Sequence, residues 1–296
     1  MDTSHPVVPH VCAVIVTFHP TTRMIENLSN VLDQVAGLVV VDNGSSAATL
    51  HLLREASLAN GFHLIENGQN LGIAEALNQG ALWAINKSYP WVILFDQDSR
   101  LTPGFMIQMF ATWTSHPQRE RVASIHPKYV HPETGVEPEV PRANDGSPFT
   151  SMTSGALMPA WAFEKIGFFA SDYFIDLVDC EYGLRTRAAG YILIDSREAV
   201  LLHTAGHPQR HVFWGFSFQP SYHSAMRRYY ISRNRVVVYR KYFRTYPSWV
   251  LHSAWLSFRE TVKCLLVEDN RARKFRNFLL GTWDGLSGRM GKREGV

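Results

Sequence analysis

The chain has 296 residues, of which 46% are hydrophobic and 19% are charged, and its formal net charge is +3. This length allows one large α/β domain or one domain with an appendage, and the composition excludes an intrinsically disordered chain. The small net charge gives no indication of nucleic-acid binding, although basic residues gather beyond Arg227.

The cysteines and the start of the chain predict a cytoplasmic protein. The three cysteines are an odd number in apolar or helical surroundings, so we expect free thiols and a reducing compartment. The first ten residues are polar and proline-rich, unlike a signal peptide, and no apolar run is long enough to span a bilayer. A second expectation is peripheral contact with the inner face of the cell membrane, through the basic and aromatic C-terminal part. The alternatives are that its basic residues are solvated helical faces and that its aromatic residues pack on the rest of the protein.

Strands and helices alternate through the first part of the chain, which is typical of a parallel sheet. We expect strands at 11–18, 38–41, 62–67 and 91–95, separated by helices at 22–34, 46–59 and 73–87. Further on we expect helices at 105–115 and 161–166, strands at 122–130, 151–160, 191–194 and 199–204, and a turn and helix at 174–188. Residues 205–220 have no clean periodicity, and helices are expected at 221–243, 247–267 and 274–280.

Polar residues follow two of the expected strands. Asp42 and Asn43 end the second strand, and Asp96 and Asp98 end the strand at 91–95. The carboxyl ends of strands in such a sheet face one ligand-binding crevice, and two close carboxylates favour a hard cation such as Mg²⁺ or Mn²⁺. The alternative is that both segments are ordinary polar turns.

Two later segments also carry candidate site residues. Asn70 and Gly72 precede a helix whose first turn can bind an anion, or Asn70 is a plain N-cap. Asp179 is a candidate general base, or it forms a capping box with Asp176. His203 is a candidate metal ligand, and His207 is close enough to compete for that role.

An ordered set of motifs resembles inverting family 2 glycosyltransferases with the GT-A fold, over roughly residues 11–206. The motifs are VCAVIVTF, VVVDNGS, NLGIAEALNQG, FDQDS, TSGALM, FIDLVDCEYGLR and LLHTAG. FDQDS, FIDLVD and RRYYISRNR are similar to bacterial rhamnosyltransferases, while IDLVDCEYGLR is also similar to galactofuranosyltransferases. The resemblance implies a Rossmann-like, mostly parallel mixed sheet flanked by helices. We therefore expect a catalytic domain at 1–220 and a C-terminal helical region at 221–296 that packs on it.

The resemblance also implies a role for each motif residue. Asp179 matches the catalytic base, and Asp98 and His203 match the metal ligands. The residues that match the nucleotide-sugar site are Thr17, Asp42, Asn43, Asn70, Gly72, Ala74, Asp96, Gln97, Ser154 and Gly155. Relatives often carry Asp where this chain has Gln97, so the metal is expected to rest on fewer carboxylates.

The implied activity is metal-dependent transfer of L-rhamnose from dTDP-β-L-rhamnose to a glycan or lipid-linked glycan, in the synthesis of a cell-surface polysaccharide such as O-antigen. One alternative is a galactofuranosyl- or hexosyltransferase that uses a UDP-sugar. Another is a non-catalytic nucleotide-sugar-binding subunit of a polysaccharide assembly complex. The cofactor is expected to be Mg²⁺ or Mn²⁺.

Overall fold

The computed structural model describes residues 10–131, 135, 142–143, 146–202, 211–213, 216–218 and 222–296. Contacts between Cα atoms divide the chain into two compact units. The first contains the described residues up to Ser171 and residues 179–202, and the second contains residues 172–178 and the described residues from 211 onward. The catalytic and helical domains expected at 1–220 and 221–296 stay a prediction.

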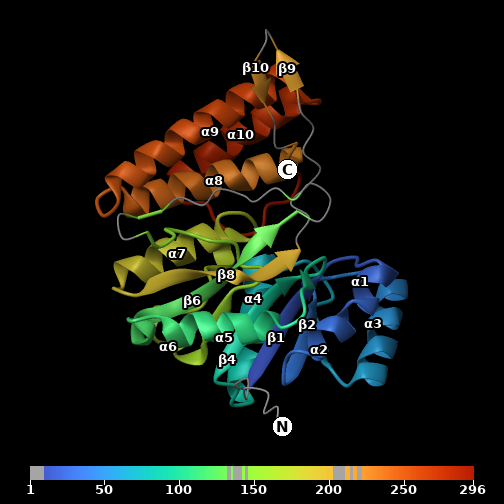
Figure 1. Ribbon diagram of the computed structural model, residues 1–296. Helices are drawn as coiled ribbons and strands as arrows, with labels where there is room; N and C mark the ends of the chain where they lie inside the picture. Colours follow the sequence, from blue (N-terminus) through green and yellow to red (C-terminus); the bar gives the residue numbers. More distant parts are fainter. Residues whose placement is uncertain are drawn as a thin grey trace, which may run out of the picture. The chain divides into compact units, whose positions relative to one another are not determined.

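The first unit is built on an eight-stranded sheet with the order β3-β2-β1-β4-β7-β6-β8-β5, which Figure 1 shows with helices against it. Neighbouring strands from β3 to β4 are parallel, β7 is antiparallel to both of its neighbours, and β6 and β8 are parallel. The strands are β1 (Val11–Thr17), β2 (Gly37–Asp42), β3 (His63–Glu66), β4 (Trp91–Asp96), β5 (Arg100–Leu101), β6 (Val122–Val130), β7 (Leu157–Pro159) and β8 (Ile192–Leu202). The helices of this unit are α1 (Thr22–Glu26), α2 (Leu28–Leu32), α3 (Ala47–Asn60), α4 (Ile73–Asn86), α5 (Phe105–Ser115), α6 (Ala160–Ile166) and α7 (Val178–Ala188).

Strand β1 is buried on both faces because helices cover each side of the sheet. Ala13 and Ile15 belong to a core cluster that also contains Phe105 of α5. Val14 points to the other face, where α4 approaches so closely that a Cβ on Gly80 would lie 2.3 Å from the Val14 Cγ1 atom. Successive side chains of a strand alternate between faces, so the continuous apolar run in the sequence follows from this double cover.

Several elements differ from the predicted ones. The expected strands at 191–194 and 199–204 are one strand, β8, whose pairing with β6 shifts register between His126 and Lys128. This irregularity accommodates the polar residues in the middle of β8, of which Arg197 and Glu198 are exposed. The strand expected at 151–160 is shorter, and the helix expected at 22–34 is divided at Asn27. Residues 211–218 contain a short antiparallel pair, β9 (His211–Phe213) and β10 (Phe216–Phe218), where no element was predicted.

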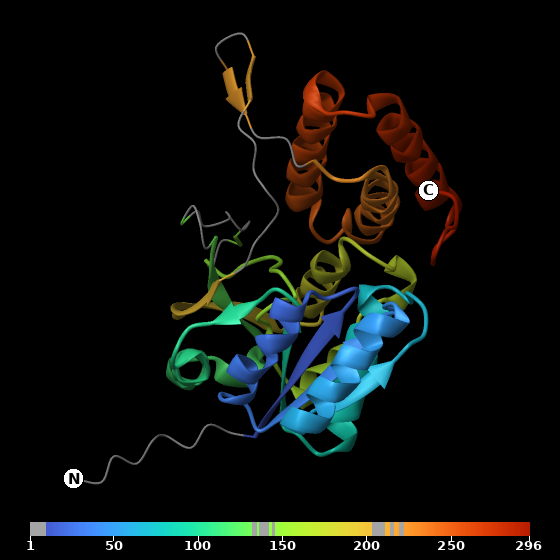
Figure 2. The ribbon, with the colours of Figure 1, turned by 90° about the vertical axis from the view of Figure 1, so that its right-hand side faces the viewer.

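The second unit is built on helices α8 (Ala225–Tyr242), α9 (Pro247–Val267) and α10 (Arg271–Ser287), which are orange to red in Figure 2. Helix α10 packs along α8 because two glycines allow the backbones to approach. A Cβ on Gly281 would lie 2.2 Å from the Tyr229 carbonyl oxygen, and one on Gly285 would lie 2.6 Å from that of Arg233. The final helix is therefore longer than the expected 274–280, since these glycines serve packing and do not end the helix.

Helix α8 also binds the turn Asp172–Val178, which lies about fifty residues earlier in the chain. Phe174, Asp176 and Leu177 have positive φ angles of 64°, 65° and 58°, a strained conformation for residues with a side chain. The fully buried Asn234 donates its amide hydrogens to the carbonyl oxygens of Tyr173, Ile175 and Asp176 at 2.8–3.0 Å. Its neighbour Arg233 donates to the carbonyls of Asp172 and Tyr173.

Two expectations on the whole chain can be compared with the structure. All three cysteines are free thiols, as predicted. Across the described ranges, no helix combines the length and the apolar character that a bilayer crossing requires.

Candidate functional site

The pairing of three strands brings the predicted polar residues to one edge of the sheet. Thr17 of β1 is paired in register with Asp42 of β2, and Val16 is paired with Asp96 of β4. These three strands are neighbours and parallel, so Thr17, Asp42 and Asp96 lie at the same carboxyl edge. The strand pattern predicted that Asp42 and Asp96 share this edge, and the family resemblance added Thr17. The edge is the usual place for a ligand in such a sheet.

The carboxylate of Asp42 is fully buried and holds its own turn. Its oxygen atoms accept hydrogen bonds from the Gly44 and Ser45 backbone amides at 3.1 and 2.8 Å, from the Ser45 hydroxyl, and from the Thr17 hydroxyl at 3.2 Å. Thr17 is also buried. In this arrangement the pair shapes the floor of the site, and the predicted contact of Asp42 with a nucleoside stays a prediction.

Asn43 connects the end of β2 to the loop before α4. Its amide oxygen accepts a hydrogen bond from the Leu71 backbone at 2.9 Å, and its amide nitrogen donates to the Asn70 side chain at 3.2 Å. The same Asn70 oxygen accepts from the Gly72 backbone at 2.9 Å. Gly72 precedes α4 with φ 90°, and Ala74 is buried in its first turn. Hydrogen bonds thus hold Asn43 against the loop of Asn70 and Gly72, and the predicted contact of this loop with a donor stays a prediction.

Gln97, between the two acids after β4, has a partner of its own. Its side-chain oxygen accepts a hydrogen bond from the Phe18 backbone amide at 2.9 Å, and its side-chain nitrogen donates to the Phe18 carbonyl at 3.4 Å. This paired contact fastens the Asp96–Asp98 turn to the end of β1. Asp96 and Asp98 are both half-buried. The sequence analysis had no signal for this role of Gln97, because the contact joins residues 79 positions apart.

Ser154 and Gly155 lie against the same turn. The Ser154 hydroxyl accepts a hydrogen bond from the Asp96 backbone amide at 3.2 Å and lies 2.7 Å from the Ser99 hydroxyl. Gly155 has φ 81°, and a Cβ there would lie 2.5 Å from Pro127, so the position requires glycine. Both residues therefore support the strand end that carries Asp96, and their predicted place beside the donor sugar stays a prediction.

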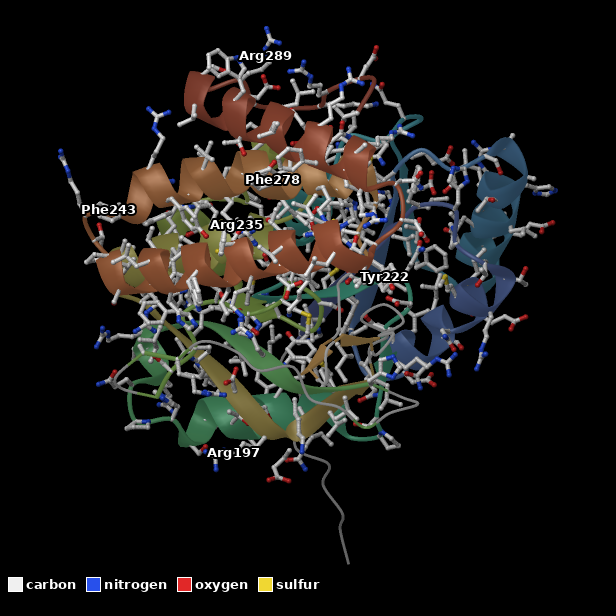
Figure 3. All side chains as sticks on the ribbon, turned by 90° about the horizontal axis from the view of Figure 1, so that it is seen from above. Arg197, Tyr222, Arg235, Phe243, Phe278 and Arg289 are labelled. Atoms are coloured by element: carbon white, nitrogen blue, oxygen red, sulfur yellow. The ribbon has the colours of Figure 1, made fainter. Side chains whose placement is uncertain are left out.

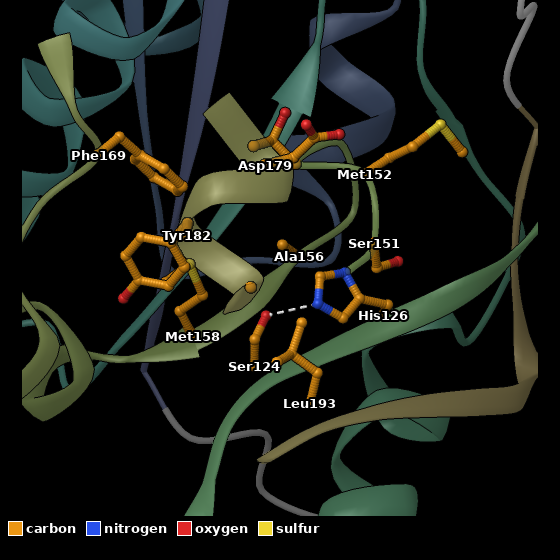
Figure 4. Close-up of a pocket in the computed structure, with 12 residues that line it drawn as sticks. Ser124, His126, Ser151, Met152, Ala156, Met158, Phe169, Asp179, Tyr182 and Leu193 are labelled. Atoms are coloured by element: carbon orange, nitrogen blue, oxygen red, sulfur yellow. Dashed lines mark hydrogen bonds between the residues drawn. The ribbon is translucent and has the colours of Figure 1, made fainter. Parts of the chain in front are cut away.

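Asp179 lies in the first turn of α7 and is half-buried. Its Oδ1 atom accepts a hydrogen bond from the Cys180 backbone amide at 2.7 Å. The alternative of a capping box with Asp176 is wrong: α7 begins at Val178, Asp176 has a positive φ, and its carboxylate forms an ion pair with Arg227. The carboxylate of Asp179 instead lines a small cavity (Figure 4).

The cavity beside Asp179 contains a buried histidine that the sequence analysis missed. Figure 4 shows His126 of β6, Tyr182 of α7 and Phe169 with Asp179 around this space, which has room for about one water molecule. The His126 Nε2 atom lies 2.9 Å from the Ser124 hydroxyl, and the ring also interacts with the Met152 backbone. Burial lowers the pKa of His126 to about 4, although Asp195 acts in the opposite direction. The histidine is therefore neutral at physiological pH.

The pKa of His126 predicts that the first unit loses stability in mild acid. The ordinary histidine pKa is about 6.5, so between pH 6.5 and 4 the unfolded chain binds a proton that the folded protein does not. The free energy of unfolding should fall as the pH is lowered, by about 2 kcal/mol at pH 5 relative to pH 8 from this group. Urea unfolding of the wild type and of His126→Asn, at pH 5 and at pH 8, measures this change in the free energy of unfolding.

The variant should show a smaller change of unfolding free energy between the two pH values than the wild type. His51→Gln is the matched control, because the His51 side chain is 72% exposed. His223 in the second unit also has its pKa lowered to about 4, chiefly by burial and then by Arg227, and it contributes equally in both proteins. The same pH dependence in wild type and His126→Asn would contradict this prediction.

The residues at the sheet edge fit a divalent cation in their chemistry. Mg²⁺ is commonly held by one or two carboxylates together with substrate phosphates, and Asp96 and Asp98 supply hard oxygen ligands of that kind. The Gln97 amide is bound to the Phe18 backbone. The described ranges contain no group of three or more His, Cys, Asp or Glu side chains that could hold a metal ion. The predicted ligand His203 and its alternative His207 lie outside the described residues.

Comparison with known proteins decides the family. The sequence model described as "Glycosyl transferase family 2" matches residues 12–148, which include the strand ends described above. The dTDP-rhamnosyl transferase RfbF of Shigella flexneri is 26% identical over 296 residues, covering 94% of this chain and 96% of that protein. Residues 12–148 of this chain therefore match a family 2 glycosyltransferase domain, and the chain is a glycosyltransferase. The resemblance expected from the motifs is thereby confirmed.

Solved structures agree with this assignment at the level of the fold. The mannosyltransferase PcManGT of Pyrobaculum calidifontis, solved with GDP-Man and Mn²⁺, superposes with a TM-score of 0.57 at 14% identity. The match covers 96% of the present chain and 89% of the PcManGT chain. Residues 1–349 of S. aureus TarS, solved with UDP-GlcNAc, give a TM-score of 0.53 at 13% identity over 95% and 73% of the two chains. The predicted fold class, GT-A with C-terminal helices, is confirmed.

Proposed function

We propose that this glycosyltransferase transfers L-rhamnose from dTDP-β-L-rhamnose to a hydroxyl of a glycan or lipid-linked glycan in cell-surface polysaccharide synthesis. The main support is the similarity to a dTDP-rhamnosyl transferase, which extends over nearly the full length of both chains. The GT-A fold with polar residues at one sheet edge is consistent with a nucleotide-sugar donor.

The donor would bind along the carboxyl edge of β2, β1 and β4. In this proposal, Thr17, Asp42 and Asn43 form the nucleoside side of the site, and Asn70, Gly72 and Ala74 form the loop over the donor. Asp96 and Gln97 lie next to the ribose and diphosphate, and Ser154 and Gly155 border the sugar. The buried hydrogen bonds of Asp42 and Asn43 would hold this surface in place before the donor arrives.

Asp98 would hold a divalent cation, together with His203. When bound, Mg²⁺ or Mn²⁺ neutralises charge on the diphosphate and makes it a better leaving group. The Mn²⁺ in the PcManGT complex belongs to that protein, and it supports the same requirement in a chain of the same fold. The backbone amides at the start of α4 would add partial positive charge on the donor side.

Asp179 would act as the general base in a single displacement. The acceptor hydroxyl oxygen attacks the anomeric carbon, the bond from that carbon to the diphosphate oxygen breaks, and the hydroxyl proton passes to the Asp179 carboxylate. The leaving group departs as dTDP, and attack from the opposite face converts the β-linked donor into an α-L-rhamnoside. Half-burial of Asp179 beside the cavity leaves part of its carboxylate exposed to an acceptor.

A donor screen tests this proposal. Purified protein is incubated with dTDP-L-rhamnose, UDP-galactofuranose or UDP-GlcNAc, with Mg²⁺ or Mn²⁺ and a crude lipid-linked glycan acceptor, and nucleotide release is measured. We expect dTDP release from dTDP-L-rhamnose to exceed UDP release from either UDP-sugar by at least about tenfold, a ratio that a few unmatched polar contacts can produce.

The comparison needs an assay without acceptor, which separates transfer from donor hydrolysis. Faster release from a UDP-sugar would replace the rhamnosyl assignment by a UDP-sugar-dependent transferase. Binding of dTDP-L-rhamnose with no nucleotide release under any condition would favour a non-catalytic subunit of a polysaccharide assembly complex.

The proposal also includes a cytoplasmic location, with peripheral membrane contact through the second unit.

A further inference from the structure

Helix α9 presents an apolar stripe to solvent. Its side chains recur at intervals of four, three, four and three residues, which places them on one side of the helix. They are Leu251, Trp255, Phe258, Val262 and Leu265, and each is 37–62% exposed. The Trp255 and Phe258 rings stack with centroids 5.9 Å apart, which makes the centre of the stripe a continuous aromatic surface. A helix on the surface of a globular protein normally turns such a stripe toward the core.

The polar side of α9 faces inward instead. The Ser253 hydroxyl accepts a hydrogen bond from the Tyr239 hydroxyl of α8 at 3.0 Å, and the Ser257 hydroxyl accepts one from Arg235, which Figure 3 labels. Cys264, on the same side of the helix, is buried. The inward face of α9 is therefore mixed, since Trp249 and Val250 are also buried there, and the apolar stripe lies outside it.

The second unit is also strongly basic. Residues 222–296 contain sixteen Lys and Arg but five Asp and Glu, a net charge of +11, whereas the remaining residues are net acidic. Two of the five acids are buried and paired: Glu268 with Arg228 and Lys274 at 2.8 and 2.7 Å, and Asp284 with Arg293. The Arg259 side chain is exposed and follows directly after Phe258 of the stripe.

We propose that the α9 stripe docks on an anionic lipid surface, with Trp255 and Phe258 inserted among the headgroups. Two attractions hold an amphipathic helix in a membrane interface: burial of its apolar side chains, and attraction of its positive charges to anionic lipids. A second copy of this chain would bring another strongly basic unit against the first, and that repulsion opposes pairing through the same face. This inference names the surface and the lipid class of the membrane contact in the proposed function, and it does not depend on the donor sugar.

Vesicle co-sedimentation of the full-length protein tests this docking. Vesicles of phosphatidylcholine with about 30% phosphatidylglycerol are compared with vesicles of pure phosphatidylcholine, at low salt and at about 0.5 M NaCl. At the higher salt concentration, charges are screened within about 5 Å. We expect binding to the anionic vesicles alone, reversal by salt, and a loss of at least about tenfold in partition for the double variant Trp255→Ser, Phe258→Ser. Leu58→Ser is the matched control, since Leu58 on α3 is 88% exposed and lies outside the second unit.

Three results would overturn the docking surface. These are no binding to any vesicle, equal binding to neutral and anionic vesicles, or full binding by the double variant. A concentration-dependent dimer in light scattering that the double variant abolishes would assign the stripe to a second copy of the chain. Circular dichroism and nucleotide release without vesicles should be unchanged in the double variant, and these measurements separate failure of the docking surface from failure of the proposed function.

Discussion

Asp179→Asn is expected to lower the rate of sugar transfer by about 10²–10⁴-fold, the usual contribution of a general base. The asparagine amide cannot take the acceptor proton, but it has nearly the same shape as the carboxylate. Its oxygen can still accept the hydrogen bond from the Cys180 backbone that Oδ1 accepts at 2.7 Å, so the first turn of α7 should persist. Transfer is measured by dTDP release in the presence of acceptor, and donor binding by calorimetry.

The loss should fall on transfer and leave the dissociation constant of the donor within about threefold, because a base acts in the transition state and contributes little to ground-state binding. Asp172→Asn is the matched control: Asp172 precedes the same helix but its side chain is exposed, so the variant should transfer at the wild-type rate. Wild-type transfer by Asp179→Asn would remove this residue from the role of base.

Asp98→Ala is expected to weaken Mn²⁺ binding, measured in the presence of dTDP, by about 100-fold. Removal of a residue that only hydrogen-bonds to a metal ligand already lowers metal affinity by about 10–100-fold. Transfer should fall by a similar factor. Calorimetry of Mn²⁺ and dTDP binding gives a result that does not depend on activity. EDTA treatment followed by return of Mg²⁺ or Mn²⁺ should first abolish and then restore transfer in the wild type.

Gln97→Leu provides the contrast within the same turn. Its amide is engaged with the Phe18 backbone and is not an expected ligand, so Gln97→Leu should lose less Mn²⁺ affinity than Asp98→Ala, through a loosened turn rather than a missing ligand. Transfer by the wild type that is insensitive to EDTA, together with unchanged Mn²⁺ binding in Asp98→Ala, would show that this glycosyltransferase works without a cation at Asp98.

The parts of the fold that the sequence predicted well are those with strong local patterns. Strands β1, β2 and β4 are continuous apolar runs because they are buried on both faces, and each ends in polar residues at the carboxyl edge. The general rule that ligands bind at that edge was enough to place Asp42 and Asp96 together, whereas Thr17 was named only from the family resemblance. The helix after the Asn70–Gly72 loop was also predicted from a local pattern: a glycine before its start and the periodic spacing of its apolar residues.

The features that were missed depend on contacts between distant residues. The polar middle of β8 resembles a loop, yet pairing with β6 keeps it extended. Gln97 resembles a substituted ligand position, but its partner is the Phe18 backbone. The position of His126 could not be predicted, because a single histidine in an apolar strand does not indicate that its ring is buried beside Asp179. Local sequence cannot specify such partners, because each is fixed only when separate elements meet.

The turn Asp172–Val178 imposes an order of events on the synthesis of this protein. Its backbone carbonyls are held by Arg233 and Asn234, which leave the ribosome about sixty residues later. Until that point, the positive φ angles at Phe174, Asp176 and Leu177 lack the hydrogen bonds that offset their strain. Asp179 follows directly after this turn, so a nascent chain can complete its sheet early and still lack a fixed start for α7. The contacts that hold the turn just before the candidate base thus come from the last quarter of the chain.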